Sequence, residues 1–138
     1  KVAASFTSFG LPPEKNSVQL IQGLYEDTLT DSSPVAFAHI DCDWYRSVMV
    51  CLERLMPRLS AGGSVIIDDY FVYSGCRTAV WDYFRQRQDE YQFVYGPRLK
   101  VYRPPPLLLN DNHGICHYFR AEKVRRTIIP GLSKLAGG

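Results

Sequence analysis

The sequence predicts an α/β fold built on a parallel sheet. Two short apolar runs, 35–40 and 64–67, are rich in β-branched and aromatic residues, as buried parallel strands are. Between them, residues 46–59 carry apolar side chains at helical spacing. The length of 138 residues and the 46% hydrophobic content suit one small domain at most.

The N-terminal part is predicted to run from helix to strand to loop. Residues 2–9 read as the last turns of a helix, which Gly10 and the pair Pro12–Pro13 end. A short strand is expected at 18–21, and a loop or short helix at 23–29.

The central part continues the alternation. After the helix at 46–59, the segment 60–63 with its two glycines is expected to turn the chain into the strand at 64–67. Ser74 is a candidate N-cap for a helix over 76–88. Three more strands are then predicted, and the consecutive prolines 104–106 form a stiff connector between the last two. These strands are 92–95, 100–102 and 115–119.

Composition excludes several classes of function. A net charge of +2, with no stripe of Lys or Arg, argues against nucleic acid as a partner. The four cysteines are widely spaced, which argues against a zinc site or a disulfide scaffold and fits a reducing cytoplasm. No apolar stretch is long enough for a membrane span, and no signal-peptide pattern is present. Because the chain starts at Lys1, it is expected to be a processed piece or a fragment.

Four carboxylates follow the two central strands. Asp41 and Asp43 come after the first, and Asp68 and Asp69 after the second. Ligands of open α/β sheets bind at the carboxyl ends of the strands, so these side chains are expected to meet at one rim. Clustered carboxylates repel one another unless a cation neutralises them, and Mg²⁺ prefers such oxygen ligands. The alternative is that each Asp only caps a helix or forms a turn.

Several segments together resemble the macrocin O-methyltransferase family, bacterial enzymes that depend on S-adenosylmethionine and Mg²⁺ and methylate sugar hydroxyls. The resemblance lies in HIDCDWY at 39–45, LERLMPRL at 52–59, GGSVIIDDY at 62–70 and GCRTAV at 75–80, with FGLP at 9–12 and GLYEDTL at 23–29 upstream. It implies that Asp41, Asp68 and Asp69 ligate Mg²⁺ and that Asp43 is the general base. The other reading of Asp43 is an N-cap of the following helix.

The resemblance also implies binding residues. Asp27 and Thr28 would lie near the cofactor, although an ordinary turn explains them equally well. Tyr45, Tyr70 and Arg77 would contact the hydroxyl-bearing small-molecule acceptor, together with Trp44; for the aromatic residues the alternative is packing, and for Arg77 it is a surface role. His39 is expected to be a hydrogen-bonded structural residue.

The implied fold is a partial class I, Rossmann-like methyltransferase fold, with a mostly parallel sheet that lacks its first two strands. The family's sheet order is 3-2-1-4-5-7-6, and residues 1–138 would be the C-terminal portion of such a domain. The sequence departs from the family in having no glycine-rich cofactor loop and in the segment 112–118.

Two consequences are expected from this truncation. The strand that ends at Asp41 becomes an exposed sheet edge, which favours oligomerisation or association through that edge. The isolated chain is expected to be inactive. The competing hypotheses are a catalytically inactive remnant that only packs against a partner, and a phosphoesterase that uses the Asp cluster.

Overall fold

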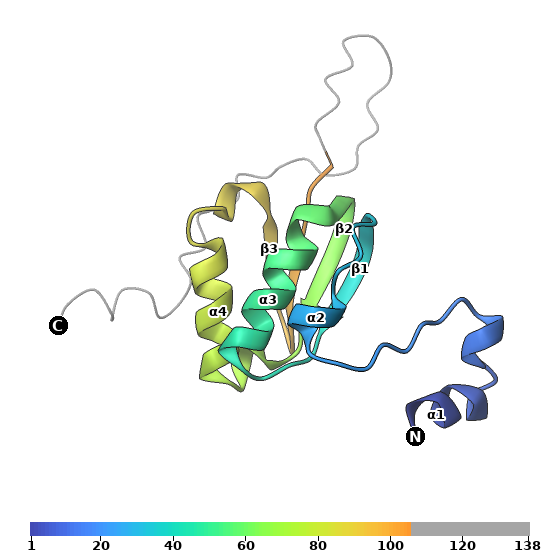
Figure 1. Cartoon of the computed structure of the whole chain (residues 1–138). Coiled ribbons are helices and arrows are strands. Elements are labelled where there is room, and N and C mark those ends of the chain that lie inside the picture. Colours follow the sequence, from blue (N-terminus) through green and yellow to red (C-terminus); the bar gives the residue numbers. More distant parts are fainter. Residues whose placement is uncertain (106–138) are drawn as a thin grey trace, which may run out of the picture. The chain divides into compact units, whose positions relative to one another are not determined.

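The computed structural model describes residues 1–105. From residue 35 to residue 95 strands and helices alternate, as predicted (Figure 1). The helices are α1 (Val2–Ser8), α2 (Tyr25–Thr28), α3 (Tyr45–Leu55) and α4 (Ser74–Phe84), and the strands are β1 (Val35–Ile40), β2 (Leu59–Ile67), β3 (Gln92–Tyr95) and β4 (Leu99–Tyr102). The strand expected at 115–119 and the divergent segment 112–118 lie outside the described residues.

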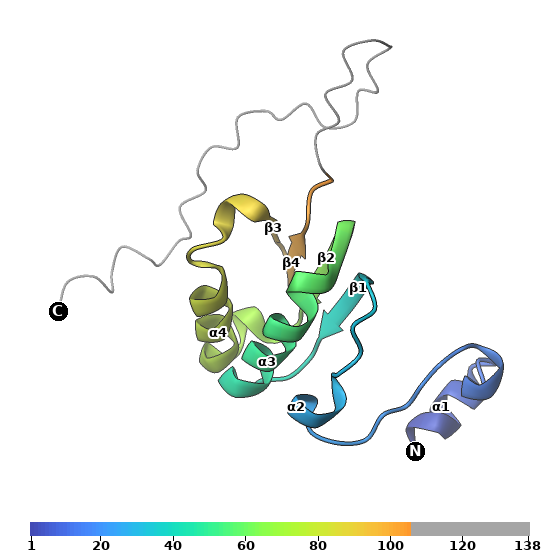
Figure 2. The same cartoon turned by 45° about the horizontal axis from the view of Figure 1, so that its top comes forward.

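The four strands form one sheet in the order β1-β2-β4-β3 (Figure 2). β1 and β2 are adjacent and parallel, which confirms that the strands ending at Asp41 and Asp68 are neighbours. β4 is antiparallel to both β2 and β3, so it alone runs against the other three strands. The described part of the chain therefore has a mixed α/β sheet with one parallel and two antiparallel pairings.

Helices α3 and α4 lie together on one side of the sheet (Figure 1). Leu52 of α3 and Ala79 of α4 are fully buried in the same core as Val65 and Ile67 of β2. Burial in β2 alternates after Gly63, because only one face of the strand meets the helices. The core therefore fixes the strand ends that carry the acidic residues.

Strand β1 lies at the edge of the sheet in the described part of the chain, as expected for a sheet without the family's first two strands. Only Ile40 of its six residues is buried, and Phe37 is 59% exposed. Of the two strands predicted from composition to be buried, β2 alternates between buried and partly exposed residues and β1 is mostly exposed, because no second strand flanks β1 within residues 1–105. The association expected through this edge stays a prediction.

Several local predictions differ from the structure. Ser74 is the first residue of α4 rather than its N-cap, which is Tyr73, and this helix ends at Phe84 rather than at residue 88. The segment 18–21 is not a strand, because it has no hydrogen-bonded strand partner in the described part of the chain. The helix expected to reach residue 59 ends earlier, since Pro57 converts its last turn into a 3-10 helix over Met56–Arg58. The segment 60–63 belongs to an irregular part of β2 rather than to a free turn, with Gly62 at φ 79°.

None of the helices in the described part is long and apolar enough to cross a membrane.

Candidate functional site

The carboxyl ends of β1 and β2 bring three carboxylates together. The parallel register pairs Ile40 with Ile67, and the amide of Asp68 donates to the carbonyl of Ile40 at 3.0 Å. One oxygen from each of Asp41, Asp68 and Asp69 then lies within 4.8 Å of the others. The convergence predicted for these three residues is confirmed.

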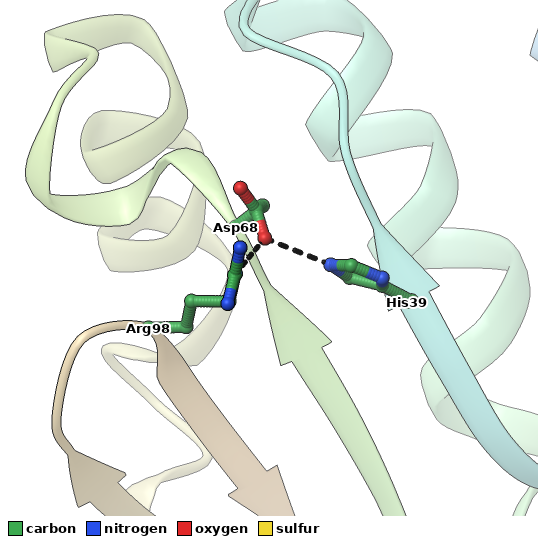
Figure 3. A network of polar contacts seen from close by, with 3 residues as sticks. All are labelled: His39, Asp68 and Arg98. Carbon is green, nitrogen blue, oxygen red and sulfur yellow. Dashed lines mark hydrogen bonds and ion pairs between the residues drawn. The ribbon is translucent and has the colours of Figure 1, made fainter.

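Asp68 is held between two donors from the neighbouring strands (Figure 3). His39 of β1 donates from Nε2 to Asp68 Oδ1 at 2.9 Å, and Arg98, just before β4, donates from Nε to the same oxygen. These hydrogen bonds to His39 and Arg98 lower the pKa of the Asp68 carboxyl. His39 is hydrogen-bonded, as expected, but its side chain is 43% exposed rather than buried.

Asp69 is in the opposite electrostatic situation. Its Oδ2 is buried and has no hydrogen-bond partner. Burial raises the pKa of Asp69, and the neighbouring Asp43 carboxylate raises it further. A buried carboxylate oxygen without a donor is costly unless a cation neutralises it. Three carboxylates and this unpartnered oxygen fit the ligand preference of Mg²⁺.

Asp43 does not cap the helix that follows it. The N-cap of α3 is Trp44, and no side chain closes this helix end. The loop is instead packed against the first turn of α4, where a Cβ on Gly75 would lie 3.1 Å from the amide nitrogen of Tyr45 and 3.5 Å from the carbonyl oxygen of Asp43. The absence of a side chain at Gly75 therefore lets the Asp43 loop lie close to α4.

Both tyrosines expected at the acceptor site contact other side chains of the chain, Tyr45 at the surface and Tyr70 in the core. Tyr45 donates its hydroxyl to Asp82 Oδ2 of α4 at 3.1 Å, and this hydrogen bond raises the pKa of Tyr45. Tyr70 is 7% exposed and packs edge-on against Phe71, with its ring centroid 6.2 Å from that of Tyr95. The hydrogen bond of Tyr45 and the ring contacts of Tyr70 give both tyrosines a structural role.

Arg77 and Trp44 are the more accessible members of the expected acceptor set. Arg77 lies in α4 with its side chain exposed, and Trp44 is 76% exposed in the loop before α3. No hydrogen bond or ion pair within residues 1–105 fixes the Arg77 guanidinium, so it is available to a ligand.

Asp27 and Thr28 lie in the short helix α2. The Thr28 hydroxyl donates to the carbonyl of Leu24 at 2.7 Å, so it serves the local turn. Gly23 precedes this turn at φ 150°, and a Cβ there would lie 2.5 Å from the Thr28 methyl group. Asp27 is exposed and is the stronger candidate of the two for an external contact.

Sequence reasoning missed Arg98. Its place beside Asp68 follows from the antiparallel pairing of Ile67 with Leu99, which sets residues 68 and 98 opposite each other. The only sequence signal is its position just before the strand predicted at 100–102.

Comparison with known proteins relates this chain to a family of O-methyltransferases. Residues 1–93 match the family model described as Macrocin-O-methyltransferase (TylF). Over 85 residues the chain is 44% identical to the 8-demethyl-8-(2,3-dimethoxy-alpha-L-rhamnosyl)-tetracenomycin-C 4'-O-methyltransferase of Streptomyces olivaceus, covering 60% of this chain and 31% of that protein. It is 34% identical over 85 residues to the demethyldecarbamoylnovobiocin O-methyltransferase of Streptomyces niveus, covering 60% and 32%.

A solved structure of an O-methyltransferase is also similar to this chain. The O-methyltransferase NovP superposes on 75% of this chain and 43% of its own, with a TM-score of 0.65 and 30% identity. The chain thus spans about a third of the length of the two curated relatives named above.

Proposed function

This chain belongs to the macrocin O-methyltransferase family, and we propose that it forms part of an enzyme that methylates a hydroxyl group of a sugar or related natural product. S-adenosylmethionine would be the methyl donor, and Mg²⁺ the metal. The observation that carries the proposal is the convergence of Asp41, Asp68 and Asp69 at the rim of the sheet. The acceptor class is taken from the relatives, which are named as O-methyltransferases of a rhamnosyl-tetracenomycin and of demethyldecarbamoylnovobiocin.

The three clustered carboxylates would hold the metal. Asp69 contributes the buried oxygen that lacks a hydrogen-bond donor, and Asp68 is kept ionised by its two donors. Bound Mg²⁺ would lower the pKa of an acceptor hydroxyl. A phosphoesterase could use the same cluster, but the family membership favours methyl transfer.

Asp43 would act as the general base. It lies next to Asp69 and is not used to cap α3, so its carboxylate can take the acceptor proton. The acceptor oxygen would then form a bond to the methyl carbon of the donor as the carbon–sulfur bond of the donor breaks, which would leave an ether and a neutral thioether. Because both reactants lose charge, the protein contributes mainly by positioning.

For binding, we propose Asp27 and Thr28 on the cofactor side and Tyr45, Tyr70 and Arg77 on the acceptor side. Asp27 and Arg77 have exposed side chains. Thr28 and the two tyrosines make internal contacts and would act chiefly by shaping the site.

Methyl transfer should be assayed in the 138-residue chain and in a chain extended upstream to the length of the relatives. The extended chain is expected to be active, and in it Asp43→Asn should lower turnover about 10²-fold or more with Mg²⁺ affinity retained. Asp68→Asn is the matched control, since it should weaken Mg²⁺ binding itself. Full turnover of Asp43→Asn at neutral pH would remove the general-base assignment.

Calorimetric titration with S-adenosylmethionine, with and without Mg²⁺, tests the competing hypothesis. An extended chain that binds neither ligand would be a packing module rather than an enzyme.

A further inference from the structure

Arg98 is placed against the acidic cluster by backbone register. Ile67 and Leu99 are paired in the antiparallel ladder, so Asp68, which follows Ile67, and Arg98, which precedes Leu99, face each other. The guanidinium of Arg98 meets Asp68 Oδ1 across this pair. The contact between Arg98 and Asp68 is therefore fixed by the pairing of β2 with β4.

Both donors to Asp68 use the same oxygen. His39 Nε2 and Arg98 Nε converge on Oδ1, while Figure 3 shows the second oxygen pointing away from both. A carboxylate oxygen with two donors has no lone pair left for a cation. A metal ion at this cluster must use the other oxygen of Asp68 or displace a donor.

Arg98 is the donor that is easier to displace. Its side chain is 53% exposed, and an exposed ion pair of this kind contributes little stability. It also carries a full positive charge next to the cluster, which lowers the cluster's attraction for a divalent cation.

We infer that Arg98 is an internal competitor of the divalent cation: it neutralises Asp68 when no cation is bound and sets the cation affinity of the cluster. This inference rests on the proposed function, because it assumes that Asp41, Asp68 and Asp69 bind the cation. It assigns to Arg98 a role in tuning affinity, separate from the ligands and from the general base.

The test is Mn²⁺ binding to the 138-residue chain, followed by the electron paramagnetic resonance signal of free Mn²⁺ at fixed salt. Arg98→Gln is expected to bind Mn²⁺ about tenfold more tightly than the unmodified chain, because a unit and a double charge about 6 Å apart repel measurably even in water. Lys100→Gln is the matched control: it removes the same charge two residues further along the chain, outside the contact with Asp68, and should change affinity less than threefold. Arg98→Lys keeps the charge and should stay within threefold of the unmodified chain.

The outcomes separate the inference from the proposed function. In one outcome, Asp69→Asn abolishes Mn²⁺ binding while Arg98→Gln leaves it unchanged or weakens it. This result would overturn the inference alone. Weaker binding by Arg98→Gln would mean that Arg98 orients Asp68. If neither the unmodified chain nor Arg98→Gln binds Mn²⁺, the cation site of the proposed function fails, and the inference fails with it. Tighter binding by Arg98→Gln that is lost on adding Asp69→Asn supports both.

Discussion

Replacing Asp69 with asparagine is expected to stabilise the chain when no divalent cation is present. The Asp69 carboxylate has one buried oxygen without a hydrogen-bond donor, and its pKa is raised by burial and by Asp43. An asparagine of nearly the same shape removes the charge and adds an amide that can donate to Asp43 or Asp41. The acidic cluster therefore lowers the stability of the folded chain.

The size of the effect follows from the spacing of the carboxylates. Two unit charges 4.8 Å apart repel by about 0.9 kcal/mol at the dielectric constant of water. Asp41 and Asp43 are the uncompensated neighbours of Asp69, whereas Asp68 is paired with Arg98. Asp43 also raises the pKa of Asp69, and with a repulsion of similar size from it the total is about 1–2 kcal/mol, which corresponds to a rise in Tm of about 5–10 °C for a domain of this size.

The gain should depend on pH with a defined sign. Because the folded pKa of Asp69 lies above its unfolded value, the folded chain binds this proton more tightly, so stability falls as the pH rises through the interval between the two values. Above the raised pKa the full cost is present, and below the unfolded value it is absent. The advantage of Asp69→Asn should therefore be largest at neutral pH and shrink in acid.

The assay is thermal and urea unfolding followed by circular dichroism, with EDTA and with Mg²⁺, at neutral and acidic pH. Asp89→Asn, at an exposed position in the 3-10 helix Gln88–Glu90, makes the same change in net charge and should shift stability by no more than about 0.5 kcal/mol. Mg²⁺ should raise the Tm of the unmodified chain more than that of Asp69→Asn. A lower Tm for Asp69→Asn in EDTA at neutral pH would refute the reasoning, since the charge would then be stabilising.

Two further substitutions test the fold that positions the site, both by urea unfolding. Leu52→Ala, at a fully buried position of α3, should lower the free energy of unfolding by about 2–5 kcal/mol. The control Glu53→Ala, on the exposed side of the same helix, should lower it by less than about 0.5 kcal/mol. Equal losses would contradict the assignment of this helix face to the core. Gly63→Ala should cost about 1–3 kcal/mol, because its Cβ would lie 2.8 and 3.0 Å from two backbone oxygens. Gly96→Ala, whose nearest contact would be an ordinary 3.8 Å, should be nearly neutral, and a neutral Gly63→Ala would mean that β2 relaxes there.

The sequence by itself determined the alternation of strands and helices and the identity of the acidic residues. Apolar runs with β-branched residues locate β1 and the second half of β2, and for β2 the physical reason is burial of one face against the helix layer. The convergence of Asp41 with Asp68 and Asp69 was predictable for the same reason: parallel neighbours end at the same rim.

Tertiary structure decided what the sequence pattern did not contain. Residues 18–21 have strand composition but no strand, because a strand exists only where another strand pairs with it. Asp68 and Asp69 are consecutive and chemically identical, yet their pKa values shift in opposite directions. The reason is their neighbours: the β2–β4 register brings Arg98 to Asp68, while the fold buries an oxygen of Asp69 beside Asp43. Such long-range pairings leave no local periodicity, so only the folded chain reveals them.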